Sequence, residues 1–264
     1  MTLLSKARHS LLRTLLCAGL AILGSASDAQ TPWLASDRVN GEARFLYGNQ
    51  IRRYDLTARN WLAARTLPRS GATAMTSDAT GGFVAYGTMI YRYDPDFTTE
   101  ALFESTSSSI HSLHLDGNLL IAVHSTGLYS RVTIFNRQTR AQLSTRETYV
   151  DSLYGTSHAP GINRLFGRTE GISPADIVSA SYTDAGVIGA TQDSPYHGDY
   201  PSAAKTWVFP NESRVVDSAG IVYGAEGLSY AGSLAGGVTD IDFNGDVPVV
   251  LRGSEVIAFS NTLV

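Results

Sequence analysis

The 264-residue chain has little of several features on which other protein classes depend. Its one cysteine, Cys17, lies near the amino terminus, so no disulfide can form within the chain. Charged residues make up 17% of the sequence, against roughly 25% in an average soluble domain. No apolar run approaches the about 20 residues of a transmembrane helix. We therefore expect a fold that is stabilised by packing alone and that has no transmembrane anchor.

Lysine is nearly absent beyond residue 29, where only Lys205 remains. Residues 30–264 hold 17 basic and 23 acidic side chains, which is a net charge of −6. An acidic chain without clusters of Lys and Arg offers no electrostatic surface for nucleic acid or anionic lipid. The composition therefore argues against a nucleic-acid partner.

The amino terminus has the pattern of a secretory signal peptide. A positively charged start precedes an uncharged apolar stretch of ten residues at 14–23. Ser27 and Ala29 then fit the small-x-small rule of a cleavage site. We predict a signal peptide at 1–29, a mature domain at 30–264, and a periplasmic or secreted location.

Beyond this leader the sequence repeats itself with a period of about 40 residues. Residues 48–55 (GNQIRRYD) match residues 87–94 (GTMIYRYD) at an offset of 39. The same apolar-x-x-aromatic-polar pattern returns at 132–136 and at 256–260. Each repeat reads as two short apolar strands around a turn, followed by weaker strands. A period of this length without a helical stripe is typical of propeller blades.

A second element of the repeat supports the same fold. Residues 113–121 align with residues 241–249 at an offset of 128, which is near three periods. A lone four-stranded sheet cannot bury both its faces, whereas blades packed on one another can. We predict an all-β protein, a β-propeller of about six four-stranded blades with an incomplete last blade. Either residues 32–45 complete that blade by pairing with the carboxyl terminus, or the chain is a truncated larger ring.

The repeat motifs resemble those of a known superfamily. Residues 54–57 (YDLT) and 135–139 (FNRQT), with the turn at 116–118 (DGN), look like exported bacterial β-propeller repeats of the YVTN or quinoprotein-like kind. The resemblance covers residues 40–260 and implies a fold rather than an activity. Quinone-dependent enzymes of this kind typically carry a tryptophan in every blade, and this chain has 3 in all, so we expect no cofactor.

Residues 161–213 are the least regular part of the chain. Residues 173–176 (SPAD) have the spacing of a capping box with proline at the first helical position, which predicts a single helical turn. Farther on, residues 193–201 (DSPYHGDYP) combine aromatic, imidazole and carboxylate groups in one polar loop. Loops of a rigid scaffold are where binding residues tend to lie.

Five residues of this region are our candidate ligand site: Tyr196, His197, Asp199, Tyr200 and Trp207. Such a mixture can stack on and hydrogen-bond to a sugar or a peptide, with the tryptophan of the following strand as a wall. The tyrosines could equally pack on the edge of a blade. We predict no catalytic residue among them.

Two segments invite a metal-binding interpretation. Residues 240–246 (DIDFNGD) resemble the start of a calcium loop, but the twelfth position is Leu251 rather than a bidentate glutamate. His111, His114 and His124 are common ligand types, but strand positions three apart point to opposite faces. We therefore favour an ordinary strand and turn in the first case and ordinary histidines in the second, and we predict no metal site.

No G-x-S-x-G element or other convergent catalytic set occurs in the sequence. The leading hypothesis is an exported, monomeric, non-catalytic propeller that acts at the cell envelope as a scaffold or as a recognition module for a protein, peptide or glycan. The alternative is a propeller-type enzyme, a glycan-directed hydrolase or lyase. Its acid and base would lie on loops at the mouth of the axial channel.

Overall fold

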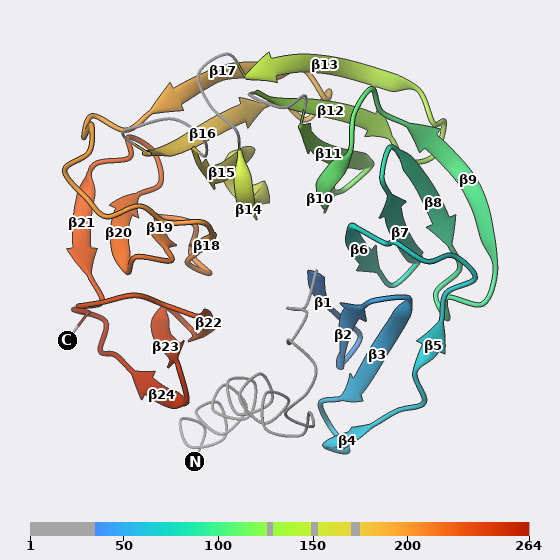
Figure 1. Ribbon diagram of the computed structural model, residues 1–264, viewed down its shortest axis with the longest axis horizontal. Coiled ribbons are helices and arrows are strands. Elements are labelled where there is room, and N and C mark those ends of the chain that lie inside the picture. The colour runs from blue at the N-terminus through green and yellow to red at the C-terminus, as the bar shows by residue number, and fades with distance from the viewer. Residues whose placement is uncertain (1–34, 126–128, 149–152, 170–174, 264) are drawn as a thin grey trace. The chain divides into compact units, whose positions relative to one another are not determined.

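The structure is a computed structural model that describes residues 35–125, 129–148, 153–169 and 175–263. These residues form six antiparallel sheets, which we number blade 1 to blade 6 along the chain (Figure 1). The chain is therefore an all-β, six-bladed β-propeller, as the repeat predicts. The signal peptide predicted at 1–29 lies outside the described residues. Among the residues described, no helix has the length and apolar character that crossing a bilayer requires.

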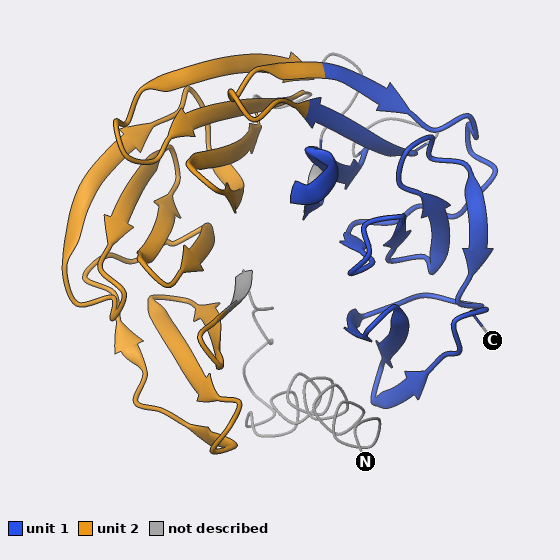
Figure 2. Ribbon diagram, turned by 180° about the vertical axis from the view of Figure 1, so that it is seen from behind, with its two compact units in different colours: residues 1–30, 151–181, 190–264 blue, residues 31–150, 182–189 orange. Residues whose placement is uncertain are grey.

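Contacts divide the chain into two compact units (Figure 2). Unit 2 holds residues 31–150 and 182–189, which include blades 1 to 3. Unit 1 holds residues 1–30, 151–181 and 190–264, which include most of blade 4 and all of blades 5 and 6.

Blades 1 to 3 follow one plan, in which strands that are consecutive in the chain are neighbours in the sheet. Their strands are β1 (Ala35–Val39), β2 (Glu42–Tyr47), β3 (Gln50–Asp55), β4 (Asn60–Trp61) and β5 (Arg65–Thr66) in blade 1; β6 (Ala74–Asp78), β7 (Gly81–Tyr86), β8 (Met89–Tyr93) and β9 (Glu100–Ser105) in blade 2; and β10 (Ile110–Asp116), β11 (Leu119–Ser125), β12 (Ser130–Asn136) and β13 (Gln142–Thr148) in blade 3. In blade 1 the fourth strand is split, because β4 and β5 both pair with β3.

Blades 4 to 6 repeat the plan, with three strands in blade 6. Their strands are β14 (Tyr154–Ala159), β15 (Arg164–Arg168), β16 (Ile177–Tyr182) and β17 (Ile188–Asp193) in blade 4; β18 (Thr206–Val208), β19 (Arg214–Asp217), β20 (Ile221–Gly224) and β21 (Tyr230–Ser233) in blade 5; and β22 (Asp240–Asn244), β23 (Val247–Arg252) and β24 (Glu255–Ala258) in blade 6. A short 3-10 helix, η1 (Pro160–Ile162), links β14 to β15.

The repeated motif lies in the third strand of its blade, in β3, β8, β12 and β24. Its two apolar positions are three residues apart, so they point to opposite faces of the strand. In blade 2, Ile90 packs into a cluster with residues of blade 3, and Tyr93 packs into another cluster with residues of blade 1. Both side chains are buried. The motif thus reflects a sheet that is covered on both faces.

The aligned turns of the repeat also match. Gly117 joins β10 to β11 and Gly245 joins β22 to β23, and both have positive φ angles, of 51° and 60°. Glycine adopts this left-handed conformation without the steric cost of a Cβ atom. The alignment of residues 113–121 with residues 241–249 therefore corresponds to the first two strands of two blades.

Two local expectations differ from the structure. Strand β1 pairs with β2, from Ala35 opposite Leu46 to Val39 opposite Glu42, so the segment 35–45 belongs to blade 1 and does not complete the last blade. The helical turn predicted at 173–176 lies partly outside the described residues, and its last two residues are not helical.

Candidate functional site

Two long connections emerge from the same end of blade 4. The connection from β15 to β16 spans eight residues, 169–176, whereas the corresponding connections of blades 1, 2 and 6 span two. The connection from β17 to β18 spans twelve residues, 194–205. Because antiparallel strands alternate in direction, these two connections leave the sheet at the same end of its strands. We call the side chains gathered there the blade 4 loop site: Asp176, Asp193, Tyr196, His197, Asp199, Tyr200 and Tyr230.

The first connection is closed at its base by hydrogen bonds. The N–H of Thr169 donates to the carbonyl oxygen of Asp176 at 2.9 Å. In return, the N–H of Asp176 donates to Oγ1 of Thr169 at 2.7 Å. Both residues are buried, so Asp176, which immediately precedes β16, is held in a fixed position.

A buried guanidinium group holds both connections. Arg168 ends β15 and donates from Nη2 to the carbonyl oxygens of Ala175, at 2.7 Å, and Pro201, at 3.3 Å. Its Nη1 donates to Oδ2 of Asp217 at 3.1 Å. Burial raises the pKa of the Asp217 carboxyl group, while Arg168 and the N–H groups of Ile221 and Ala219 oppose that rise. Arg168 thereby joins the loop site to the interior of unit 1.

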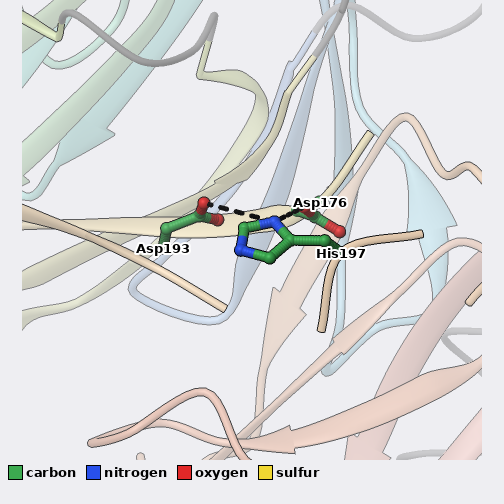
Figure 3. A group of neighbouring side chains, drawn as sticks. All are labelled: Asp176, Asp193 and His197. Carbon is green, nitrogen blue, oxygen red and sulfur yellow. Dashed lines mark hydrogen bonds and ion pairs between the residues drawn. The ribbon is translucent and has the colours of Figure 1, made fainter. Parts of the chain in front are cut away.

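Three side chains converge above this base (Figure 3). Nδ1 of His197 donates to Oδ2 of Asp176 at 3.1 Å and lies 4.0 Å from Oδ2 of Asp193. The remaining oxygens face the backbone: Oδ1 of Asp176 accepts from the N–H of Gly198 at 3.4 Å, and Oδ1 of Asp193 accepts from the N–H of Ser194 at 2.8 Å. The imidazole ring lies between the two carboxyl groups, and its side chain is 68% exposed.

Little positive charge lies close to the two carboxylates. Among the described residues, His197 is the one basic side chain that pairs with either of them. Burial raises the pKa of Asp193, the charge of Asp176 raises it further, and His197 opposes the rise. The site therefore concentrates negative charge around one imidazole.

A group of tyrosines lies beside these residues. The ring of Tyr200 meets those of Tyr196 and Tyr223 edge to face, with centroids 5.2 and 5.8 Å apart. It stacks on Tyr230 with centroids 5.5 Å apart and an interplanar angle of 9°. The hydroxyl oxygen of Tyr196 accepts a hydrogen bond from the N–H of Tyr230 at 3.0 Å. Tyr230 is 48% exposed, so one aromatic ring of the group is open to solvent.

The structure brings together four of the five candidate residues. Tyr196 and Tyr200 are in contact, and His197 lies between the carboxylates. Burial raises the pKa of Tyr200, and the neighbouring tyrosines and the exposed Asp199 raise it further. Trp207 instead packs against an apolar cluster formed by blades 5 and 6. In the described part of the chain, no ring contact joins it to the loop tyrosines.

The sequence analysis missed two residues of the site. Asp176 carried the signal of a helix cap, and Tyr230 begins a short strand rich in small residues. The position of Asp176 follows from pairing in the sheet: the N–H of Ser194 donates to the carbonyl oxygen of Ile177 at 3.1 Å, which sets the end of β17 beside the start of β16. No local sequence pattern signals that proximity.

The other polar segments lie in strands and in a turn. Residues 240–246 form β22 and the turn after it, as favoured from the sequence. His124 is buried, with Nδ1 2.7 Å from Oγ of Ser108 and Nε2 2.9 Å from Oγ1 of Thr133. Nε2 of His114 lies 2.7 Å from Oγ of Ser112.

Solved structures that resemble this fold include three that align over most of the chain. Hydrazine synthase from Kuenenia stuttgartiensis aligns with a TM-score of 0.65 and 9% identity over 83% of this chain and 80% of that chain. The computationally designed Ika8 protein aligns at 0.61 and 13% identity over 90% and 86%. The WD40 domain of Neurospora crassa Pan2 aligns at 0.56 and 12% identity over 83% and 71%. Identities this low support the six-bladed propeller fold alone.

No protein-family model matches the chain, and no curated protein matches it.

Proposed function

We propose that the chain is an exported, non-catalytic recognition module that binds a glycan at the blade 4 loop site. Its location at the cell envelope, its monomeric state and its kinship with YVTN or quinoprotein-like repeats belong to the same proposal. The leader at 1–29 and the motif at 54–57 support export and kinship.

The observation that carries the proposal is the stack of Tyr200 on Tyr230. The stack holds Tyr230 in place while 48% of that residue stays exposed. A rigid, amphipathic ring binds a ligand at a low cost in conformational entropy. Sugars suit such a ring because their C–H faces pack on aromatic surfaces and their hydroxyl groups remain free to hydrogen-bond.

The charges beside the ring favour a ligand that donates hydrogen bonds. Asp193 and Asp199 present carboxylate oxygens, which only accept hydrogen bonds when ionised. Hydroxyl groups of a glycan can supply the donors, whereas an acidic peptide would be repelled. These residues therefore support a hydroxyl-rich ligand without acidic groups.

The enzyme alternative receives less support from the same residues. Carboxylate oxygens of Asp176 and Asp193 lie within 4.8 Å of each other, but the imidazole between them is largely exposed to water. Glycosidic cleavage requires an acid held in an enclosed site, with a second carboxylate at a defined distance. We therefore do not propose catalysis.

A glycan and peptide array probed with residues 30–264 tests the proposal. We expect glycan hits and, in titrations of those hits, about tenfold weaker binding by Tyr230→Ala. Tyr129→Ala, which removes an exposed tyrosine of blade 3, is the matched control and should bind like the parent chain. The absence of glycan hits, peptide hits alone, or full binding by Tyr230→Ala would each overturn the assignment.

A further inference from the structure

The donor atoms of the blade 4 loop site have the spacing of a metal shell. One imidazole nitrogen and two carboxylate oxygens, from two segments of the chain, lie within 4.8 Å of one another. Nδ1 of His197 is 3.1 Å from Oδ2 of Asp176 and 4.0 Å from Oδ2 of Asp193. With metal bonds of about 2.0–2.2 Å, neighbouring donors of a tetrahedral zinc shell lie about 3.4 Å apart. Displacements of under about 1 Å would therefore place all three donors around one ion.

The negative charge of Asp176 and Asp193 favours a bound cation. Asp176 is only 8% exposed, and neither it nor Asp193 pairs with any Lys or Arg of the described segments. Buried carboxylates are normally paired with a basic group or bound to a metal. An imidazole alone compensates two carboxylates incompletely, so a divalent ion would complete the balance.

The ligands are also held in advance. One oxygen of each carboxylate accepts a backbone N–H, which turns the other oxygen toward His197. Below them, Thr169 and Arg168 fix the backbone on both sides of the site. Such support from groups around the ligands is what gives a metal site its affinity.

We propose that Asp176, Asp193 and His197 bind a divalent transition-metal ion, for which Zn²⁺ is the best match. Imidazole nitrogen suits zinc and its neighbours, whereas Ca²⁺ and Mg²⁺ prefer shells made of oxygen alone. The exposed side of His197 leaves room for a water molecule or a ligand atom as a further donor. This inference goes beyond the recognition function and does not depend on it.

Calorimetric titration of metal-free residues 30–264 with zinc chloride tests the site. We expect one saturable site per chain, with affinity for Zn²⁺ exceeding that for Ca²⁺ or Mg²⁺. His197→Ala and Asp193→Asn should each weaken binding by about 100-fold or more, because even the groups that support metal ligands contribute about 10 to 100-fold. Glu255→Gln removes an exposed carboxylate of blade 6 from outside the loop site and should change the affinity less than twofold.

Three results would overturn the site: no saturable zinc binding, unchanged affinity in His197→Ala, or tighter binding of Ca²⁺ than of Zn²⁺. Anomalous scattering from zinc-soaked crystals supplies a second measurement and should place the ion against Nδ1 of His197. Because His197 is largely exposed, its variant is expected to fold, which circular dichroism verifies. Zinc binding without any glycan hit would keep this inference and overturn the proposed function, and glycan hits without zinc binding would do the reverse.

Discussion

Two pairs of ionisable side chains lie at opposite ends of the connection from β15 to β16, and they differ in their exposure to solvent. At one end, Arg168 and Asp217 form a pair whose side chains are 2% and 0% exposed. At the other end, Asp176 meets His197, whose ring is mostly in water. The surrounding protein closes this buried ion pair off from solvent, so a ligand cannot reach it. In the second pair, the exposed imidazole of His197 remains accessible to a ligand. Position in the fold, rather than residue type, therefore separates the structural pair from the candidate site.

The largest expected effect comes from breaking the buried pair. Asp217→Ala leaves Arg168 buried without its counter-charge and should lower the free energy of unfolding by about 3–5 kcal/mol. Urea unfolding of residues 30–264, followed by circular dichroism, measures the change. Asp199→Ala, an exposed carboxylate, is the control and should cost less than about 0.5 kcal/mol. A loss below about 1 kcal/mol for Asp217→Ala would show that the pair is solvated.

Two buried histidines, His111 and His124, should make the stability of the protein depend on pH. Burial, with smaller effects of Arg131 and His111, lowers the pKa of His124 to about 4. Burial alone lowers the pKa of His111 to about 4. In the unfolded chain both imidazoles have the ordinary value of 6.5, so below that pH the unfolded state takes up protons that the folded state refuses. Stability should therefore fall as the pH drops from 6.5 toward 4.

For His124 alone, the loss between pH 7 and pH 5 should be about 1–2 kcal/mol. Urea unfolding at the two pH values measures it. His124→Gln keeps a polar side chain that does not titrate, so it should flatten part of the dependence. A parent chain with equal stability at both values would contradict the burial of these histidines.

An intermediate effect is expected at Tyr200, which lies between the interior and the surface. Its ring contacts Tyr196, Tyr223 and Tyr230, so Tyr200→Ala should cost about 1–2 kcal/mol. Tyr200→Phe keeps the ring and should cost less than about 0.5 kcal/mol. Thermal unfolding of both variants measures the difference. Equal stability of Tyr200→Ala and the parent would assign the ring to ligand binding rather than to packing.

The smallest effect is expected at the exposed end of the comparison. His197→Ala removes a side chain that is largely in water, so without added metal its stability should stay within about 0.5 kcal/mol of the parent. Urea unfolding in the presence of a chelator provides the measurement. A larger loss would mean that the imidazole is part of the structural core, like that of His124.

The repeat predicted much of the fold because burial on both faces leaves a local signature. Ile90 and Tyr93 belong to one five-residue strand, and each packs into a different apolar cluster. Gly117 marks its turn in the same local way, through a backbone conformation that favours glycine. Such signals lie within a few residues of one another and can be aligned.

The loop site could be predicted only in part. Tyr196, His197 and Tyr200 occupy one loop, so their proximity is visible in the sequence. Asp176 is 21 residues from His197, and its approach depends on how β16 and β17 are paired. Trp207 follows the loop closely, yet its side chain turns to the cluster shared with blade 6 because successive residues of a strand point to opposite faces.

The sharing of apolar clusters between blades has a consequence for how unit 2 folds. Blade 2 supplies side chains both to the cluster with blade 1 and to the cluster with blade 3. Neither cluster can be complete until blade 2 is in place, which links the three blades into one cooperative transition. The slowest-exchanging amide protons of unit 2 should therefore lie in β7 and β8, the two middle strands of blade 2.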